Sequence, residues 1–213
     1  MKNDAFELVV AGTGFASAFF LHRYLERRDA SARVLVLERG ALRPHNWQQM
    51  YGARLTSEAS ASIDNRTPTK PWVFKLAVGG GSNCWWGCAP RLLPEDFEMR
   101  TRYGVGADWP VTYGELERYY ADAEALMAVA GPSDGSPYPR SGPYPQAPHR
   151  FSEPDRYFKQ RFPDQFFNQP AARPTQALPS GRPACCNSGV CHQCPINSKF
   201  SVLNGMPRPF DDS

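Results

Sequence analysis

The first forty residues alternate between short apolar runs and breaks of glycine or charge. Residues 6–11 form an apolar run with adjacent valines between polar flanks, which predicts a buried β-strand. The glycine turn 12–14 follows at once, and residues 15–28 have the alanine, leucine and aromatic content of a helix with a charged end. Residues 33–37 predict a second strand, which leads directly into Glu38. The expected order is therefore strand, glycine turn, helix and strand, with an acid at the end.

Further along, the pattern predicts one more long helix. Residues 41–78 show no sustained periodicity, so we expect them to be irregular. A capping box of Thr112 and Glu115 begins a helical pattern over 113–130, which Gly131-Pro132 ends. The apolar face expected for this helix consists of Leu116, Tyr119, Tyr120, Ala123, Leu126, Met127 and Ala130.

A proline-rich stretch separates this helix from the end of the chain. Of the 21 prolines, 12 lie between 132 and 183, which favours extended or looped structure. We expect an N-terminal nucleotide-binding segment at 1–131, a proline-rich extended connection at 132–184, and a cysteine-bearing loop with the start of a further segment at 185–213. The fold class is α/β, an incomplete Rossmann-like, doubly wound domain. Because such a domain needs more parallel strands, we expect the chain to be the N-terminal part of a longer protein.

Composition excludes several classes of protein. The 213 residues are 41% hydrophobic and 21% charged, as in globular proteins, and the net charge of +3 gives no indication of nucleic-acid binding. No apolar stretch is long enough to span a membrane. Asp4 and Glu7 stand where a secretory signal would be basic. The absence of a signal favours the cytoplasm, whereas a partner subunit with a signal would carry the chain to the periplasm, so the compartment stays open.

The first glycine turn has the residue types of a dinucleotide site. Gly12 permits a tight turn, Gly14 lets the backbone approach a pyrophosphate, and the small Ser17 allows close helix–strand packing. Glu38 is placed to accept hydrogen bonds from the ribose hydroxyls of an adenosine. The alternative is a tight turn without a ligand. This unit alone does not distinguish FAD from NAD.

Two later motifs resemble the glucose–methanol–choline (GMC) oxidoreductases. They are the second glycine segment, 78–87 (VGGGSNCWWG), and the stretch 108–113 (DWPVTY) with its following Tyr-Tyr pair, which is similar to bacterial sugar and gluconate dehydrogenase flavoprotein subunits. The resemblance implies FAD, bound through Gly12, Gly14, Ser17 and Glu38. It also places Gly80, Gly81, Ser82 and Asn83 near the isoalloxazine ring.

Four of the six cysteines lie within ten residues, at Cys185, Cys186, Cys191 and Cys194. Clustered thiolates in a chain of this kind favour a metal over a disulfide framework. The loop resembles the one that holds an iron–sulfur cluster in some sugar dehydrogenase subunits of the family. Its last interval is one residue shorter than in that pattern, so a structural zinc site and cysteines without a ligand stay open as alternatives.

Catalysis and partners follow from the resemblance only. The family's histidine base lies near the far C-terminal end of its members, and no residue of this chain is a credible catalytic base. The implied reaction is oxidation of an alcohol or sugar hydroxyl to a carbonyl, with a small subunit and a cytochrome as partners. The alternative is a non-catalytic dinucleotide-binding fragment with a structural zinc loop.

Overall fold

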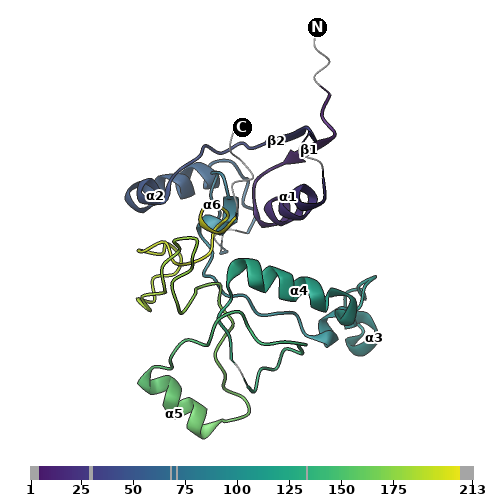
Figure 1. Ribbon diagram of the computed structural model, residues 1–213, viewed down its shortest axis with the longest axis vertical. Helices are drawn as coiled ribbons and strands as arrows, with labels where there is room; N and C mark the ends of the chain where they lie inside the picture. The colour runs from purple at the N-terminus through teal and green to yellow at the C-terminus, as the bar shows by residue number, and fades with distance from the viewer. Residues whose placement is uncertain (1–4, 29–30, 68, 71, 133, 207–213) are drawn as a thin grey trace. The chain divides into compact units, whose positions relative to one another are not determined.

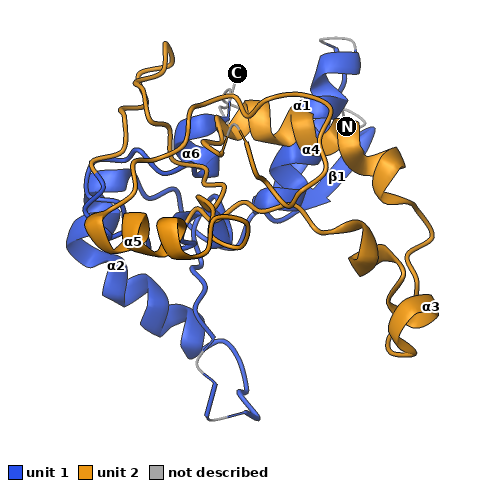
Figure 2. Ribbon diagram, turned by 90° about the horizontal axis from the view of Figure 1, so that it is seen from below, with its two compact units in different colours: residues 1–86, 187–213 blue, residues 87–186 orange. Residues whose placement is uncertain are grey.

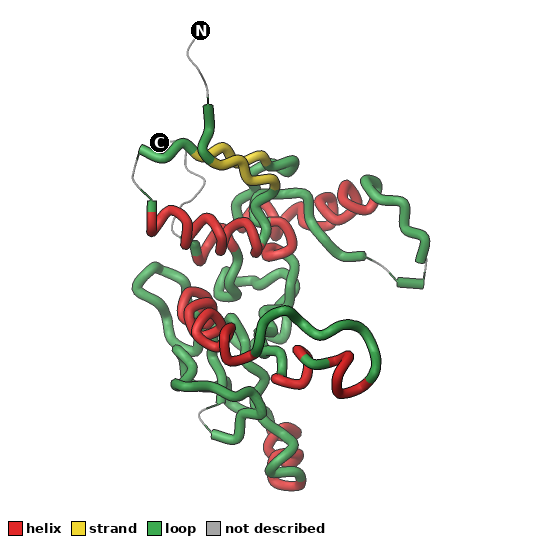
Figure 3. Tube along the Cα trace, turned by 90° about the vertical axis from the view of Figure 1, so that its right-hand side faces the viewer, coloured by secondary structure: helices red, strands yellow, loops and turns green. Residues whose placement is uncertain are grey.

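The computed structural model describes residues 5–28, 31–67, 69–70, 72–132 and 134–206. Its contacts divide the chain into two compact units (Figure 2), which are unit 1, residues 1–86 with 187–213, and unit 2, residues 87–186. These boundaries differ from those of the three segments expected from composition. Much of the trace is loop (Figure 3), as the high proline content leads one to expect.

Unit 1 begins with the expected strand, turn, helix and strand. Strand β1 (Leu8–Ala11) leads through the glycine turn into helix α1 (Phe15–Arg27), and β2 (Val34–Leu37) then returns beside β1 (Figure 1). The two strands pair in parallel along their whole length. A parallel pair needs a crossover between its strands, and α1 supplies it. The α/β class is confirmed, and the small sheet is compatible with part of a Rossmann-like domain.

The expectation of irregular structure over 41–78 is wrong for its first part. Helix α2 (His45–Ser60) occupies sixteen residues of this stretch, with a kink at Tyr51. Its buried positions are Gln48, Gly52, Leu55 and Ala59. They recur at helical spacing, but only one of them is a large apolar residue, so a hydrophobicity pattern does not reveal the helix.

The connection after β2 brings the second glycine segment toward the first. Ala41 forms a parallel bridge with Ala77, and a Cβ on Gly40 would lie 2.2 Å from the backbone nitrogen of Ala77. Only glycine therefore permits this close approach. The segment then continues into the short 3-10 turn η1 (Gly80–Asn83), which lies two residues beyond Val78.

Helix α6 (Val202–Gly205) and the residues before it complete the core of unit 1. Phe200 is fully buried, and its ring lies 6.1 Å from that of Phe15 and 6.0 Å from that of Phe19, both on α1. The Nε1 of Trp85 donates a hydrogen bond of 2.7 Å to the carbonyl of Phe200. This segment thus packs against both α1 and the second glycine segment.

Unit 2 contains the 3-10 turn η2 (Pro94–Phe97) and helices α3 (Met99–Tyr103), α4 (Tyr113–Met127) and α5 (Glu153–Arg161). The capping box at the start of α4 is confirmed. The helix ends three residues before the expected position, because Ala128 adopts a left-handed conformation with φ of 53°. Helix α5 lies within the proline-rich segment that we expected to be extended or looped.

Six of the seven positions expected on the apolar face of α4 are half-buried or buried, but the most buried residue of the helix is a glutamate. Tyr119, expected to face the core, is 49% exposed, whereas Glu124 is only 4% exposed. Its carboxylate accepts bonds of 2.8 and 2.9 Å from Nε and Nη2 of Arg91, and a bond of 2.9 Å from Nη2 of Arg140. Glu117 accepts a further bond of 2.8 Å from Nη1 of Arg91. An apolar-face argument misses such a residue because it treats glutamate as solvent-facing.

Glu117 makes the stability of unit 2 dependent on pH. Hydrogen bonds from Arg91 and Ser141 lower the pKa of its carboxyl from the usual 4.5 to about 2. Since the pKa is lower in the folded state, the stabilisation is complete above about pH 4.5 and is lost as the pH falls toward 2. We expect chemical unfolding of Glu117→Gln to be less pH-dependent than wild type over this interval. Equal slopes for the two proteins would contradict this role of Glu117.

Two points concern membrane-spanning helices and the end of the chain. No helix in the described ranges is both long and apolar enough to cross a membrane. Residues 207–213, the end of the segment expected to begin at residue 185, lie outside the described residues.

Candidate functional site

A hydrogen-bonded junction centred on Thr13 connects the elements singled out in the sequence. The backbone N–H of Thr13 donates to Oε2 of Glu38 at 2.9 Å, and its hydroxyl donates to the same oxygen. The Thr13 hydroxyl also accepts a bond of 2.9 Å from the N–H of Gly79. The Gly40 N–H donates to Oε1 of Glu38 at 2.7 Å. One threonine, 2% exposed, thereby holds the first glycine turn, the end of β2 and the second glycine segment together.

Three of the predicted glycines face open space. A Cβ added to Gly12, Gly14 or Gly81 would meet no atom within 4 Å. Gly12 also needs its φ of +85°, whereas Gly14 has an ordinary φ of −70°. A Cβ on Gly80 would lie 3.6 Å from Cα of Gly14, so the two glycine segments are adjacent. Within the described residues, nothing requires glycine at Gly14 or Gly81, which suits positions where a ligand approaches the backbone.

The start of α1 is suited to binding an anion. Gly14 is its N-cap residue, no side chain caps its first turn in the described structure, and that turn contains no acid. The backbone N–H groups of a first helical turn lack partners within the helix and carry the positive end of the helix dipole. Ser17 lies in this turn and is half-buried, next to the fully buried Ala18. These features fit the pyrophosphate of a dinucleotide.

Ser82 and Asn83 make their hydrogen bonds within the protein. The hydroxyl of Ser82, fully buried, donates to the Gly79 carbonyl at 2.6 Å and accepts from the N–H of Val202 at 3.0 Å. The side-chain amide of Asn83 donates to the Val78 carbonyl at 2.9 Å. Both side chains thus stabilise η1, and their predicted contact with a flavin ring stays a prediction.

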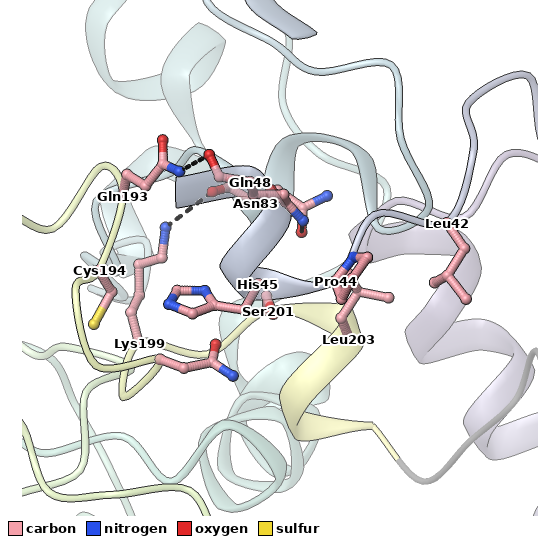
Figure 4. Close-up of a pocket in the computed structure, with 11 residues that line it drawn as sticks. Leu42, Pro44, His45, Gln48, Asn83, Gln193, Cys194, Lys199, Ser201 and Leu203 are labelled. Atoms are coloured by element: carbon pink, nitrogen blue, oxygen red, sulfur yellow. Dashed lines mark hydrogen bonds between the residues drawn. The ribbon is translucent and has the colours of Figure 1, made fainter. Parts of the chain in front are cut away.

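A cavity of about 370 Å³ lies in unit 1 beside Asn83 (Figure 4). The loop before α2, the start of α2, the loop 193–199 and the residues around α6 enclose it. The side chains drawn in Figure 4 include two that bond across it, Gln193 to the carbonyl of Gln48 and Lys199 to the carbonyl of Asn83. The lining residues are Leu42, Pro44, His45, Gln48, Asn83, Gln193, Cys194, Asn197, Lys199, Ser201 and Leu203.

One buried cation, Lys199, lines this cavity, and none of the lining residues is a carboxylate. Lys199, which is 4% exposed, lines it, and burial lowers the pKa of its ammonium to about 8. Lys75, 3% exposed, lies close enough to Cys84 to interact with it electrostatically, and burial lowers its pKa as well. Burial also lowers the pKa of His45. Sequence reasoning missed both lysines, because a lysine is normally solvent-facing even beside apolar neighbours such as Phe74 and Phe200.

The four clustered cysteines fall in both units. Cys191 and Cys194 belong to unit 1 and are buried, each 8% exposed, and the Cys194 sulfur accepts a bond of 3.3 Å from the N–H of Ser198. Cys185 is half-buried and Cys186 exposed, and both belong to unit 2. No three His, Cys, Asp or Glu side chains of the described residues come together as a metal site. The role of these cysteines as ligands therefore stays a prediction.

Comparison with known proteins identifies two dehydrogenases. The fructose dehydrogenase large subunit of Gluconobacter japonicus is 30% identical over 237 aligned positions, which cover 94% of this chain and 43% of that protein. The 2-methyl-1,2-propanediol dehydrogenase of Mycolicibacterium austroafricanum is 33% identical over 99 positions, which cover 45% of this chain and 18% of that protein. The chain thus spans less than half the length of either relative. No protein-family model matches it. On the extent of the first similarity, the chain belongs to the same family as the fructose dehydrogenase large subunit, a GMC-type flavoprotein.

Proposed function

We propose that this chain carries the FAD site of a dehydrogenase that oxidises an alcohol or sugar hydroxyl to a carbonyl. Both relatives are dehydrogenases, and their names give a sugar and a diol as substrates. These compounds share a carbon that bears a hydroxyl group. The observation that carries the proposal is the Thr13 junction, which joins the first glycine turn, Glu38 and the second glycine segment.

Each part of the junction has a role toward FAD. The N–H groups at the start of α1 would bind the pyrophosphate, with Gly12 and Gly14 leaving room for it. Glu38 would accept the ribose hydroxyls, while Thr13 and Gly40 hold its carboxylate in place. The backbone at Gly80 and Gly81 would lie along the flavin. When bound, FAD supplies a hydride acceptor for the carbinol carbon.

The resemblance supports two further parts of this proposal. A small subunit and a cytochrome would be the partners that receive electrons, in keeping with the word "large" in the name of the first relative. Cys185, Cys186, Cys191 and Cys194 would bind an iron–sulfur cluster. Assays for iron, acid-labile sulfide and zinc on anaerobically purified protein test the second part. Iron and sulfide would support it, whereas zinc alone or no metal would refute it.

Substitution of Glu38 tests the orientation of FAD in the site. Only the adenosine half of FAD carries the ribose that Glu38 would bind, and FMN lacks that half. We expect Glu38→Gln to weaken FAD binding by roughly 10- to 100-fold, the effect of losing one or two charge-assisted hydrogen bonds. The affinity for FMN should change by less than about 3-fold, because FMN lacks the ribose that Glu38 would bind. This limit corresponds to about 0.65 kcal/mol of binding free energy. Fluorescence titration measures both.

The comparison of the two flavins separates a specific effect from a general one. Glu38→Gln also disturbs bonds to Thr13 and Gly40, so partial loosening of the turn would weaken FMN and FAD together. Exposed Glu58 on α2 offers a control, because Glu58→Gln changes the same charge away from the junction. An unchanged FAD affinity in Glu38→Gln would show that this carboxylate does not bind the ribose.

A further inference from the structure

The ammonium group of Lys199 connects two segments that the proposed function treats separately. It donates to the carbonyls of Trp85 at 2.7 Å, His192 at 3.1 Å and Asn83 at 3.4 Å. Asn83 and Trp85 lie in the second half of the second glycine segment, whereas His192 lies in the cysteine loop, defined here as residues 191–197. All of these residues belong to unit 1. The three protons of one side chain are therefore shared between the two segments.

Because Lys199 is buried, its hydrogen bonds oppose movement of either segment. An ammonium in the interior needs hydrogen bonds to offset the hydration that it loses, and here carbonyl groups supply them. If either segment moves, Lys199 loses acceptors while it stays buried, and a charged group left unsatisfied in this way is unfavourable. Ordering of one segment therefore favours ordering of the other.

The bonds on either side of Lys199 restrict how the two segments can separate. Toward the glycine segment, the Val202 N–H bonds to Ser82 at 3.0 Å, so the residues that follow Lys199 are fixed there. Toward α2, the side chain of Gln49 donates to the Pro195 carbonyl at 2.6 Å and that of Cys194 at 3.3 Å. Within this framework, Lys199 joins the glycine segment to the first part of the cysteine loop by hydrogen bonds, beside the ring contact of 6.3 Å between Trp86 and His192.

We propose that Lys199 is a positioning residue that couples occupation of the FAD site to the order of the cysteine loop. The inference rests on the proposed function in that FAD is the ligand. FAD lying along Gly80 and Gly81 restrains the backbone up to Trp85, and Lys199 passes this restraint to His192. By thermodynamic linkage, a restraint on the cysteine loop strengthens FAD binding by the same factor.

Hydrogen–deuterium exchange of the cysteine loop, with and without saturating FAD, tests this coupling. In the wild type we expect FAD to slow exchange there by about 5- to 150-fold, the usual range for coupled sites. In Lys199→Met the slowing should fall below about 2-fold, because the side chain keeps its length but loses its donors. Lys199→Arg, which can donate to the same carbonyls, should restore part of it.

Lys75→Met is the matched control. Lys75 is as deeply buried as Lys199, but its ammonium has no hydrogen-bond partner in the described part of the chain. Removing it deletes a buried charge without cutting a connection, so FAD should slow exchange as in the wild type. If Lys199 had only a structural role, Lys199→Met would raise the exchange rate equally with and without FAD, and the ratio of the two rates would stay unchanged.

The outcomes separate this inference from the function on which it rests. If wild type binds FAD but shows no slowing in the loop, or if Lys199→Met keeps the full slowing, the coupling does not exist. If wild type does not bind FAD, the proposed function fails first. If Lys199→Met does not fold, the comparison of Lys199→Arg with Lys75→Met still tests the coupling. Only Lys199→Arg should change the ratio of the exchange rates without and with FAD.

Discussion

Replacing Gly14 by alanine should abolish most FAD affinity and leave the protein as stable as before. The added Cβ meets no protein atom within 4 Å, and the φ of −70° suits any residue. In FAD-bound protein, however, this methyl group would occupy the space of the pyrophosphate at the start of α1. We expect a loss of affinity of about 100-fold, or 2.7 kcal/mol. Titration with FAD, together with urea unfolding of the free protein, measures both quantities.

The choice of Gly14 rather than Gly12 makes this test specific. Gly12 requires a φ of +85°, so alanine there would strain the turn whether or not a ligand binds. Gly142, in unit 2, provides the control, because its Cβ also meets open space and it lies outside the glycine segments. Gly142→Ala should bind FAD as wild type does. Wild-type affinity in Gly14→Ala would mean that the start of α1 does not hold the pyrophosphate.

Truncation of Glu124 should produce the largest loss of stability. Its carboxylate pairs with Arg91, whose side chain is 1% exposed, and with Arg140. Glu124→Ala leaves the Arg91 guanidinium buried, with Glu117 as its remaining carboxylate partner. Breaking a buried pair in this way costs about 3–5 kcal/mol. Urea unfolding followed by the fluorescence of Trp109, in unit 2, measures it.

An exposed ion pair of the same unit gives the comparison. Arg102 and Glu95 lie 4.0 Å apart and are both well exposed, so Glu95→Ala should cost less than about 1 kcal/mol. The residues of the proposed FAD site belong to unit 1, and we expect Glu124→Ala to retain FAD binding when folded. If Glu124→Ala and Glu95→Ala were equally stable, the buried charges would not organise unit 2.

Local signals made the start of the fold predictable. The strand–turn–helix–strand order followed from β-branched runs and a glycine turn, because these choices depend on neighbours in sequence. Helix α2 was missed because its buried face uses glutamine, glycine and alanine around one leucine. Glu124 was missed for a related reason, since its burial depends on Arg91 and Arg140, which lie outside its helix.

The candidate site likewise combines features that depend on neighbours in sequence with features that depend on distant residues. Gly12, Gly14 and Glu38 follow from a compact motif, and the structure brings them beside the second glycine segment. The role of Thr13 depends on Gly79, sixty-six positions away, and sequence spacing does not reveal it. Lys199 lacks a sequence signal for the same reason, because its acceptors are backbone carbonyls of distant residues.

Direct titration of the wild-type protein with FAD tests the central claim, that the two glycine segments form one FAD site. We predict saturable binding of one FAD per chain, seen as quenching of flavin fluorescence, and competition by ADP, which shares the adenosine and pyrophosphate groups. ADP should displace FAD, because it occupies the Glu38 and Gly14 end of the site. Absence of FAD binding, or FAD binding that ADP does not affect, would contradict the account.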